Sequence, residues 1–196
     1  MTNRAIIQIF AEFGPVVAFF TAGQLLPFTQ AVAVLVVTTI LGLILSWLNF
    51  GRLPVLPLWS GVIVIITGTL TIYFQMPDAI IIADTIYFWL FAALVAIGFY
   101  RPTHFLERLF DETFAITPAG WRRLSQRWLV VLIIAGFANE YVRMTMTPEF
   151  WIDYKFTKVI LLTMFSLYQF TLARKYRIEG ESNIWGLRIS DNNRTT

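Results

Sequence analysis

The chain has 196 residues, of which 57% are hydrophobic and 14% are charged, and its formal net charge is +3. Soluble domains carry about 25% charged residues, and a fold of this length has too little interior for so many apolar side chains, so the composition excludes an ordinary soluble domain. The arginines gather in two stretches without a soluble basic face, which argues against nucleic acid as a partner, and the absence of cysteine excludes disulfides and thiolate chemistry.

The first apolar segment, residues 5–21, is short and contains Glu12 and Pro15. It could cross the membrane, or it could form a broken or re-entrant helix whose free backbone groups are buried in protein. We do not expect a cleaved signal peptide, because Glu12 interrupts the apolar run and a cut after Ala22 would place bulky Phe20 where a small residue is needed.

Five further segments have about the 20 mainly apolar residues that a helix needs to cross the hydrocarbon core. They are residues 31–50, 53–77, 79–100, 128–146 and 150–173. The small residues Thr38, Gly42 and Ser46 recur every four positions, a spacing that lets helices approach closely, and we interpret it as packing within the chain rather than a dimer seam. The sequence therefore predicts an all-α, polytopic helical membrane protein with six hydrophobic segments, of which five or six span.

The polar loop over residues 101–126 contains an amphipathic stretch, residues 102–110, which predicts a short helix in the membrane interface. Lys and Arg concentrate in this loop and just after the last span, so the positive-inside rule places the loop and the C-terminus in the cytoplasm. We assign residues 1–178 to a helical transmembrane domain and residues 179–196 to a polar tail, which we expect to be mobile.

A helix is predicted to begin at Thr117-Pro118, which reads as an N-cap followed by proline at the first helical position. Tryptophan suits the aromatic belt of a membrane, and arginine at that level suits lipid phosphates. The candidate lipid or partner contacts at this helix are Trp121, Arg122, Arg127 and Trp128.

A second group of candidates is intramembrane or structural, because a charge at the bilayer centre costs about 2.5–3.5 kcal/mol. The group consists of Glu12, Asp84, Asn139, Glu140, Trp151, Lys155 and Lys158. Glu12 is either a proton or substrate site or, as we favour, a carboxyl held by another helix or exposed at the mouth of a re-entrant segment. Asp84 lies about a turn inside its helix and should reach the outer interface. Glu140 could pair with Lys155 or Lys158 across the last hairpin, as a structural clamp.

Catalytic, cofactor and metal sites are not expected. The single histidine, His104, lies beside a loop arginine, and the sequence shows no metal cluster, nucleophile–base pair, GxGxxG or P-loop.

The stretch GWRRLSQRWLVVLIIAGFANEYVRMTMTPEFWIDYKF, residues 120–156, resembles the intracellular septation protein A family, also called YciB. The opening Glu12-Phe13-Gly14-Pro15 and the element over residues 86–91 also fit, and the resemblance covers roughly residues 10–174. The family usually has Lys-Pro-Thr where this chain has Ile82-Ala83-Asp84. This departure indicates a divergent member and puts in doubt any role that depends on the missing lysine.

The resemblance implies a bacterial inner-membrane protein that is linked to septation, envelope integrity and membrane homeostasis and that contacts division and elongation proteins. We therefore expect a non-enzymatic protein with anionic lipid headgroups and such membrane proteins as partners, and homo-oligomerisation stays open. The alternative is a small transporter or lipid-handling protein with Glu12 and Asp84 in a cavity. An intramembrane enzyme would need a converging acid–base or metal constellation, which the sequence does not show.

Overall fold

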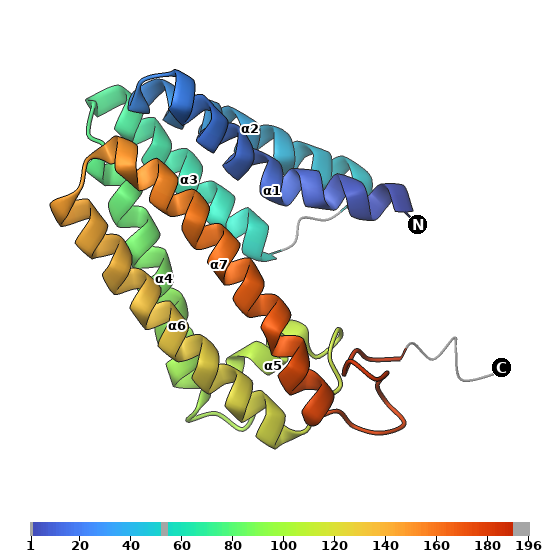
Figure 1. Ribbon diagram of the computed structural model, residues 1–196. Coiled ribbons are helices and arrows are strands. Elements are labelled where there is room, and N and C mark those ends of the chain that lie inside the picture. The colour runs from blue at the N-terminus through green and yellow to red at the C-terminus, as the bar shows by residue number, and fades with distance from the viewer. Residues whose placement is uncertain (1, 52–54, 190–196) are drawn as a thin grey trace. The chain divides into compact units, whose positions relative to one another are not determined.

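A computed structural model describes residues 2–51 and 55–189, with side chains described there except in residues 2–12, 50 and 55–57. The helices in chain order are α1 (Thr2–Leu25), α2 (Phe28–Phe50), α3 (Val55–Phe74), α4 (Asp78–Gly98), α5 (Phe105–Phe110), α6 (Pro118–Thr145) and α7 (Pro148–Lys175) (Figure 1). Apart from these helices, the described residues form only isolated β-bridges. The predicted all-α class is confirmed.

Four of the helices in the described ranges are long and apolar enough to cross a membrane, namely Phe28–Asn49, Asp78–Gly98, Pro118–Thr145 and Pro148–Lys175. The described apolar parts of α1 and α3 are shorter and cover Phe13–Leu25 and Leu58–Phe74. The first segment is one 24-residue helix with Pro15 inside it, so it is not broken. Such a helix is about 36 Å long, which exceeds the roughly 30 Å hydrocarbon core. The chain is therefore a polytopic membrane protein.

The chain divides into two compact units, and α4, α6 and α7 contribute residues to both. The first unit comprises Met1–Tyr87 and Phe137–Lys158. In it α1 packs along α2, and α2 packs along α3 (Figure 1). Its buried core includes Phe19, Val32 and Trp151, which are at most 1% exposed.

Small residues bring α2 and α3 together in the first unit. A Cβ atom on Gly61 would lie 2.8 Å from Leu43 Cδ1, and one on Gly68 would collide with Val36. Gly42 and Ser46, from the small-residue face of α2, are both buried within the chain. Their burial agrees with the interpretation that this face packs internally.

The second unit comprises Phe88–Gly136 and Val159–Thr196. Its core gathers apolar side chains from α4, α5, α6 and α7, including Val95, Leu106, Trp121 and Leu172. The short helix α5 forms where it was predicted, but it buries Leu106 in this core, and its Phe105 ring packs edge-on against Phe91 at 5.5 Å. Part of its apolar face therefore packs on protein instead of lipid.

The C-terminal segment, residues 176–189, folds back on residues 113–117. Backbone amides of Thr117 and Ile178 donate to Tyr176 O at 2.8 Å and Ala115 O at 2.9 Å, and isolated bridges join Ile116 to Arg177 and Phe114 to Leu187. The expectation of a mobile tail is therefore wrong for residues 179–189, because most of their backbone amides donate hydrogen bonds within the chain. Residues 190–196 lie outside the described part of the chain.

Gly186 fixes this segment to the end of α7. Its φ is +78°, and an added Cβ would lie 2.7 Å from the carbonyl oxygen of Ala173. We expect Gly186→Ala to loosen the segment, because alanine is strained at positive φ and its methyl group also collides with the backbone of α7. Hydrogen exchange at the amides of Ile178 and Leu187 should become faster.

Gly180→Ala is the matched control, since Gly180 has a φ of +87° but open space around its Cα. Its substitution carries the conformational strain without the collision, so exchange should rise less than for Gly186→Ala. Equal exchange in the two variants would show that contact with α7 does not hold the segment.

Candidate functional site

A carboxylate on α4 holds two lysines of α7 within the first unit. Lys155 Nζ donates to Asp84 Oδ1 at 2.8 Å, and Lys158 Nζ donates to Asp84 Oδ2 at 2.5 Å. The three side chains are only 19%, 12% and 7% exposed, in the order Asp84, Lys155, Lys158. Residues three apart lie on one helical face, so both ammonium groups reach the same acid. The rings of Trp151 and Tyr154 add cation–π contacts at 4.8 Å and 4.9 Å.

Asn139 of α6 joins this ion cluster to α4. Its side chain is 0% exposed. Its Nδ2 donates to Ile81 O at 3.0 Å and to Thr85 Oγ1 at 2.9 Å, while its Oδ1 accepts from Trp151 Nε1 and Lys158 Nζ, both at 3.0 Å. An asparagine amide offers two donors and two acceptor lone pairs, and all four are used here.

The network continues along α6 to the start of α4. Thr85 Oγ1 donates to Glu140 Oε2 at 3.3 Å, and Arg143 Nε donates to Glu140 Oε1 at 3.0 Å. Arg143 Nη1 then lies 3.7 Å from Asp78 Oδ2. The side chains of three helix segments in one unit thus form one connected set of hydrogen bonds and ion pairs, which we call the polar network.

The polar network balances its own charge. It contains three acids and three bases, namely Asp78, Asp84, Glu140, Arg143, Lys155 and Lys158. Mutual pairing and full hydrogen bonding are what make charges tolerable in a span. In the part of the chain that the structure describes, no cluster of His, Asp and Glu could hold a metal ion. The arrangement therefore fits a clamp between helices better than a ligand site.

The predicted pairing of Glu140 with Lys155 or Lys158 is wrong, and Asp84 does not act as a separate group at the outer interface. Successive helical residues point about 100° apart, so Asn139 reaches Lys158 while Glu140 accepts from Thr85 and Arg143. The sequence contained one usable signal, because an acid and two bases inside spans are expected to pair. It did not show that α4 lies beside α7.

The four candidate interface residues on α6 do not share one surface. Trp121 is 2% exposed and lies in the core of the second unit, so its expected contact with lipid or a partner is wrong. Arg122 is exposed. Arg127 Nη1 donates to Gln169 Oε1 at 3.2 Å, and the ring of Trp128 packs edge-on against Phe165 at 5.1 Å. The sequence placed both tryptophans at the level of the membrane interface, but it could not show that protein covers them.

Glu12 falls within α1, but its side chain lies outside the described residues.

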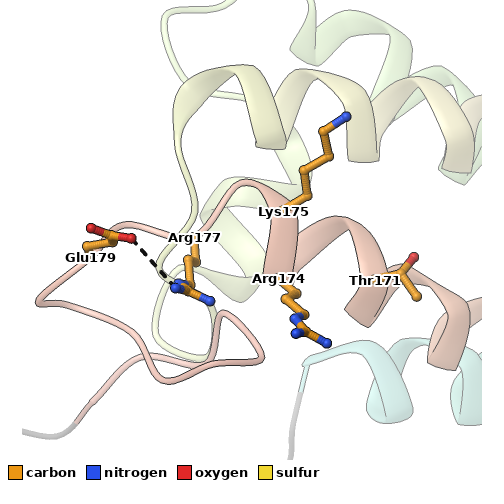
Figure 2. A pocket seen from close by; sticks show the side chains of 5 residues that line it. All are labelled: Thr171, Arg174, Lys175, Arg177 and Glu179. Carbon is orange, nitrogen blue, oxygen red and sulfur yellow. Dashed lines mark ion pairs between the residues drawn. The ribbon is translucent and has the colours of Figure 1, made fainter.

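A second group of charged residues, close to the end of α7, lines a pocket of about 380 Å³ in the second unit (Figure 2). The lining residues are Thr171, Arg174, Lys175, Arg177 and Glu179. In the sequence, the only indication of this site is that the bases Arg174, Lys175 and Arg177 lie close together.

Comparison with known proteins gives a consistent match over most of the chain. Residues 7–179 match the family model described as "Intracellular septation protein A". Relatives named "Inner membrane-spanning protein YciB" include those of Bradyrhizobium sp. (strain ORS 278), 34% identical over 87% of this chain and 86% of that protein, and Nitrobacter hamburgensis, 30% identical over 89% and 88%. The relative from Brucella suis biovar 1 is 28% identical over 91% and 97%. No solved structure matches the chain.

Proposed function

Because the chain belongs to the intracellular septation protein A family, we propose that it supports cell septation, envelope integrity and membrane homeostasis without catalysing a reaction. Its relatives are named as membrane-spanning proteins rather than as enzymes. The protein acts through contacts with anionic lipid headgroups and with membrane proteins of division or elongation. The polar stretch over residues 101–126 and the C-terminus face the cytoplasm.

The internal pairing of the polar network is the observation that supports this proposal. A transporter site needs charged or polar groups that are available to a substrate. Here the carboxylate of Asp84 is occupied by two ammonium groups, and all four hydrogen-bonding capacities of Asn139 are used within the chain. This favours a rigid scaffold over the alternative of a small transporter.

Surface charge supports the lipid contact. Arg101, Arg108, Arg122 and Arg123 all lie exposed near the ends of helices in the second unit. Basic side chains close to a membrane surface are attracted to anionic lipids, by about 1 kcal/mol each. The same exposed arginines are available to acidic segments of partner proteins.

A deletion strain tests the proposal. Cells that lack this protein should be longer, with delayed or misplaced septa, and should be more sensitive to detergent; expression of the wild-type chain should reverse both defects. Microscopy and growth assays measure these outcomes. Normal septation and normal detergent sensitivity in the deletion strain would overturn the proposed function.

Arg122→Ala/Arg127→Ala should reduce the anionic phospholipid or the partner protein that co-purifies, because two cations are lost. Gln169→Leu is the control, since it removes the hydrogen bond to Arg127 but keeps its charge. Lipid analysis and partner pull-down from membranes with equal protein levels provide the measurement. If both are unchanged in the double variant, these arginines have no part in the contact.

A further inference from the structure

The pocket at the end of α7 carries excess positive charge. Arg174, Lys175 and Arg177 face one acid, Glu179, among its lining residues. Figure 2 shows the side chain of Arg177 directed at Glu179, with Lys175 extending to the other side of the helix end from Arg174. Arg174 and Arg177 supply the two guanidinium groups among the lining residues.

The acid in the pocket is a weak competitor for these bases. Arg177 Nη2 lies 3.6 Å from Glu179 Oε1, and the side chain of Glu179 is 87% exposed. An exposed pair of this kind contributes about 0–1 kcal/mol. A group with two negative oxygens can therefore displace Glu179, because planar guanidinium groups bind phosphate with two hydrogen bonds each.

An exposed apolar turn stands beside the pocket and is held there by its own backbone. Asn183 Oδ1 accepts from the amides of Trp185 at 2.9 Å and Leu187 at 3.1 Å. This turn exposes 63% of Ile184 and 45% of Trp185. The guanidinium carbon of Arg174 lies 5.7 Å from the centroid of the Trp185 ring. An aromatic and an aliphatic side chain next to arginine are typical of the membrane interface.

The position of the pocket along α7 matches the edge of a hydrocarbon layer. Residues 159–173 contain no Asp, Glu, Lys or Arg, and at about 1.5 Å per residue they extend roughly 22 Å. Arg174 is the first charge after this run. Because this charge-free run ends at Arg174, its guanidinium group can extend to lipid phosphates beside the hydrocarbon core.

We propose that Arg174 and Arg177 bind the phosphate group of an anionic phospholipid, while Ile184 and Trp185 enter the adjacent interface. This inference rests on the proposed function, because it assigns one lipid contact of that function to a specific pocket. The excess of cations, the weak internal acid and the anchored apolar turn point to the same occupant. A free phosphate ion carries the negative charge that the arginines bind, but it makes no apolar contact with Ile184 and Trp185.

The test uses the full chain in a neutral detergent and native mass spectrometry. The protein is titrated separately with short-chain phosphatidylglycerol, short-chain phosphatidylcholine and inorganic phosphate. Phosphatidylglycerol should bind most tightly. Arg174→Gln/Arg177→Gln should weaken it by roughly tenfold or more, because two charge-assisted contacts are lost. Arg101→Gln/Arg123→Gln removes the same charge from exposed arginines outside the pocket, and it should weaken phosphatidylglycerol binding clearly less than the pocket variant does.

Trp185→Ala provides a second variant that keeps the charge of the pocket. It should weaken phosphatidylglycerol binding and leave the response to inorganic phosphate unchanged. Equal losses of phosphatidylglycerol binding in the two double-arginine variants would overturn the proposal that this pocket binds the lipid. Equal binding of phosphatidylcholine and phosphatidylglycerol by the wild-type chain would do the same. Inorganic phosphate that binds as tightly as phosphatidylglycerol would overturn a lipid as the occupant.

The phenotype of the deletion strain and the lipid binding of the arginine variant together separate this inference from the proposed function. If the deletion strain has a septation or envelope defect and the arginine variant binds lipid normally, the pocket assignment fails alone. If the variant loses lipid binding but deletion of the protein has no such defect, the proposed function fails while the lipid site stands.

Discussion

Asp84→Asn should lower the free energy of unfolding by about 3 kcal/mol, at the low end of what removing one partner of a buried ion pair costs. The variant keeps the shape of the side chain but leaves Lys155 and Lys158 without the carboxylate that both contact. Lys155 is the more exposed lysine and can extend towards water, which limits the loss. Thermal unfolding of the purified protein in detergent measures the effect.

Two comparisons make the result specific to the ion cluster. Glu149→Gln removes one negative charge from an exposed position at the start of α7 and should leave the unfolding midpoint nearly unchanged. Asp84→Asn/Lys158→Met removes both charges of one pair and should recover part of the lost stability. If Asp84→Asn unfolds at the same temperature as Glu149→Gln, the carboxylate is not needed to hold the lysines.

The spans could be predicted from sequence because their cause is local. A run such as residues 31–50 has no charged side chain, and its transfer into hydrocarbon depends mainly on its own composition. The start of α6 was predicted for a similar reason. Thr117-Pro118 carries its own capping chemistry, and Thr117 Oγ1 accepts from the amide of Gly120 at 3.3 Å.

The partners of the site residues could not be predicted, because the paired residues lie far apart in the sequence. Lys155 and Lys158 follow their acid by 71 and 74 residues, and helical spacing shows only which residues share a face. It does not show which helix that face meets. Most polar residues of the network were identified as structural candidates, but Asp78, Thr85 and Arg143 were missed. The pairing that joins Asp84 to both lysines follows from tertiary packing.

The folded C-terminal segment shows a different limit. Its bridges to residues 113–117 use main-chain amides and carbonyls, which every residue except proline offers. A polar composition therefore suggested a tail without structure. The few apolar residues of the segment, such as Ile184 and Leu187, give no measure of the backbone hydrogen bonds that form beside them.

Asn139→Leu should destabilise the chain by about 3–5 kcal/mol, because it removes four hydrogen bonds while keeping the branched shape of the side chain. The indole N–H of Trp151 and the ammonium group of Lys158 both lose an acceptor in a buried site. Leaving a buried donor unsatisfied costs about 1–3 kcal/mol, and more for a charged group. The unfolding midpoint in detergent is the measurement, and Gln24→Leu, which removes one exposed hydrogen bond to Asp153, is the control.

Trp151→Phe tests whether the amide and the indole act together. Phenylalanine keeps an aromatic ring against Phe19 and Phe28 but lacks the N–H. If Asn139 stabilises the unit partly through Trp151, the combined loss in Asn139→Leu/Trp151→Phe should be smaller than the sum of the single losses, by about 0.5–3 kcal/mol. Strictly additive losses would mean that the two side chains stabilise α6 and α7 independently. The clamp would then reduce to the contacts of Asn139 with α4 and the ion pairs of Asp84.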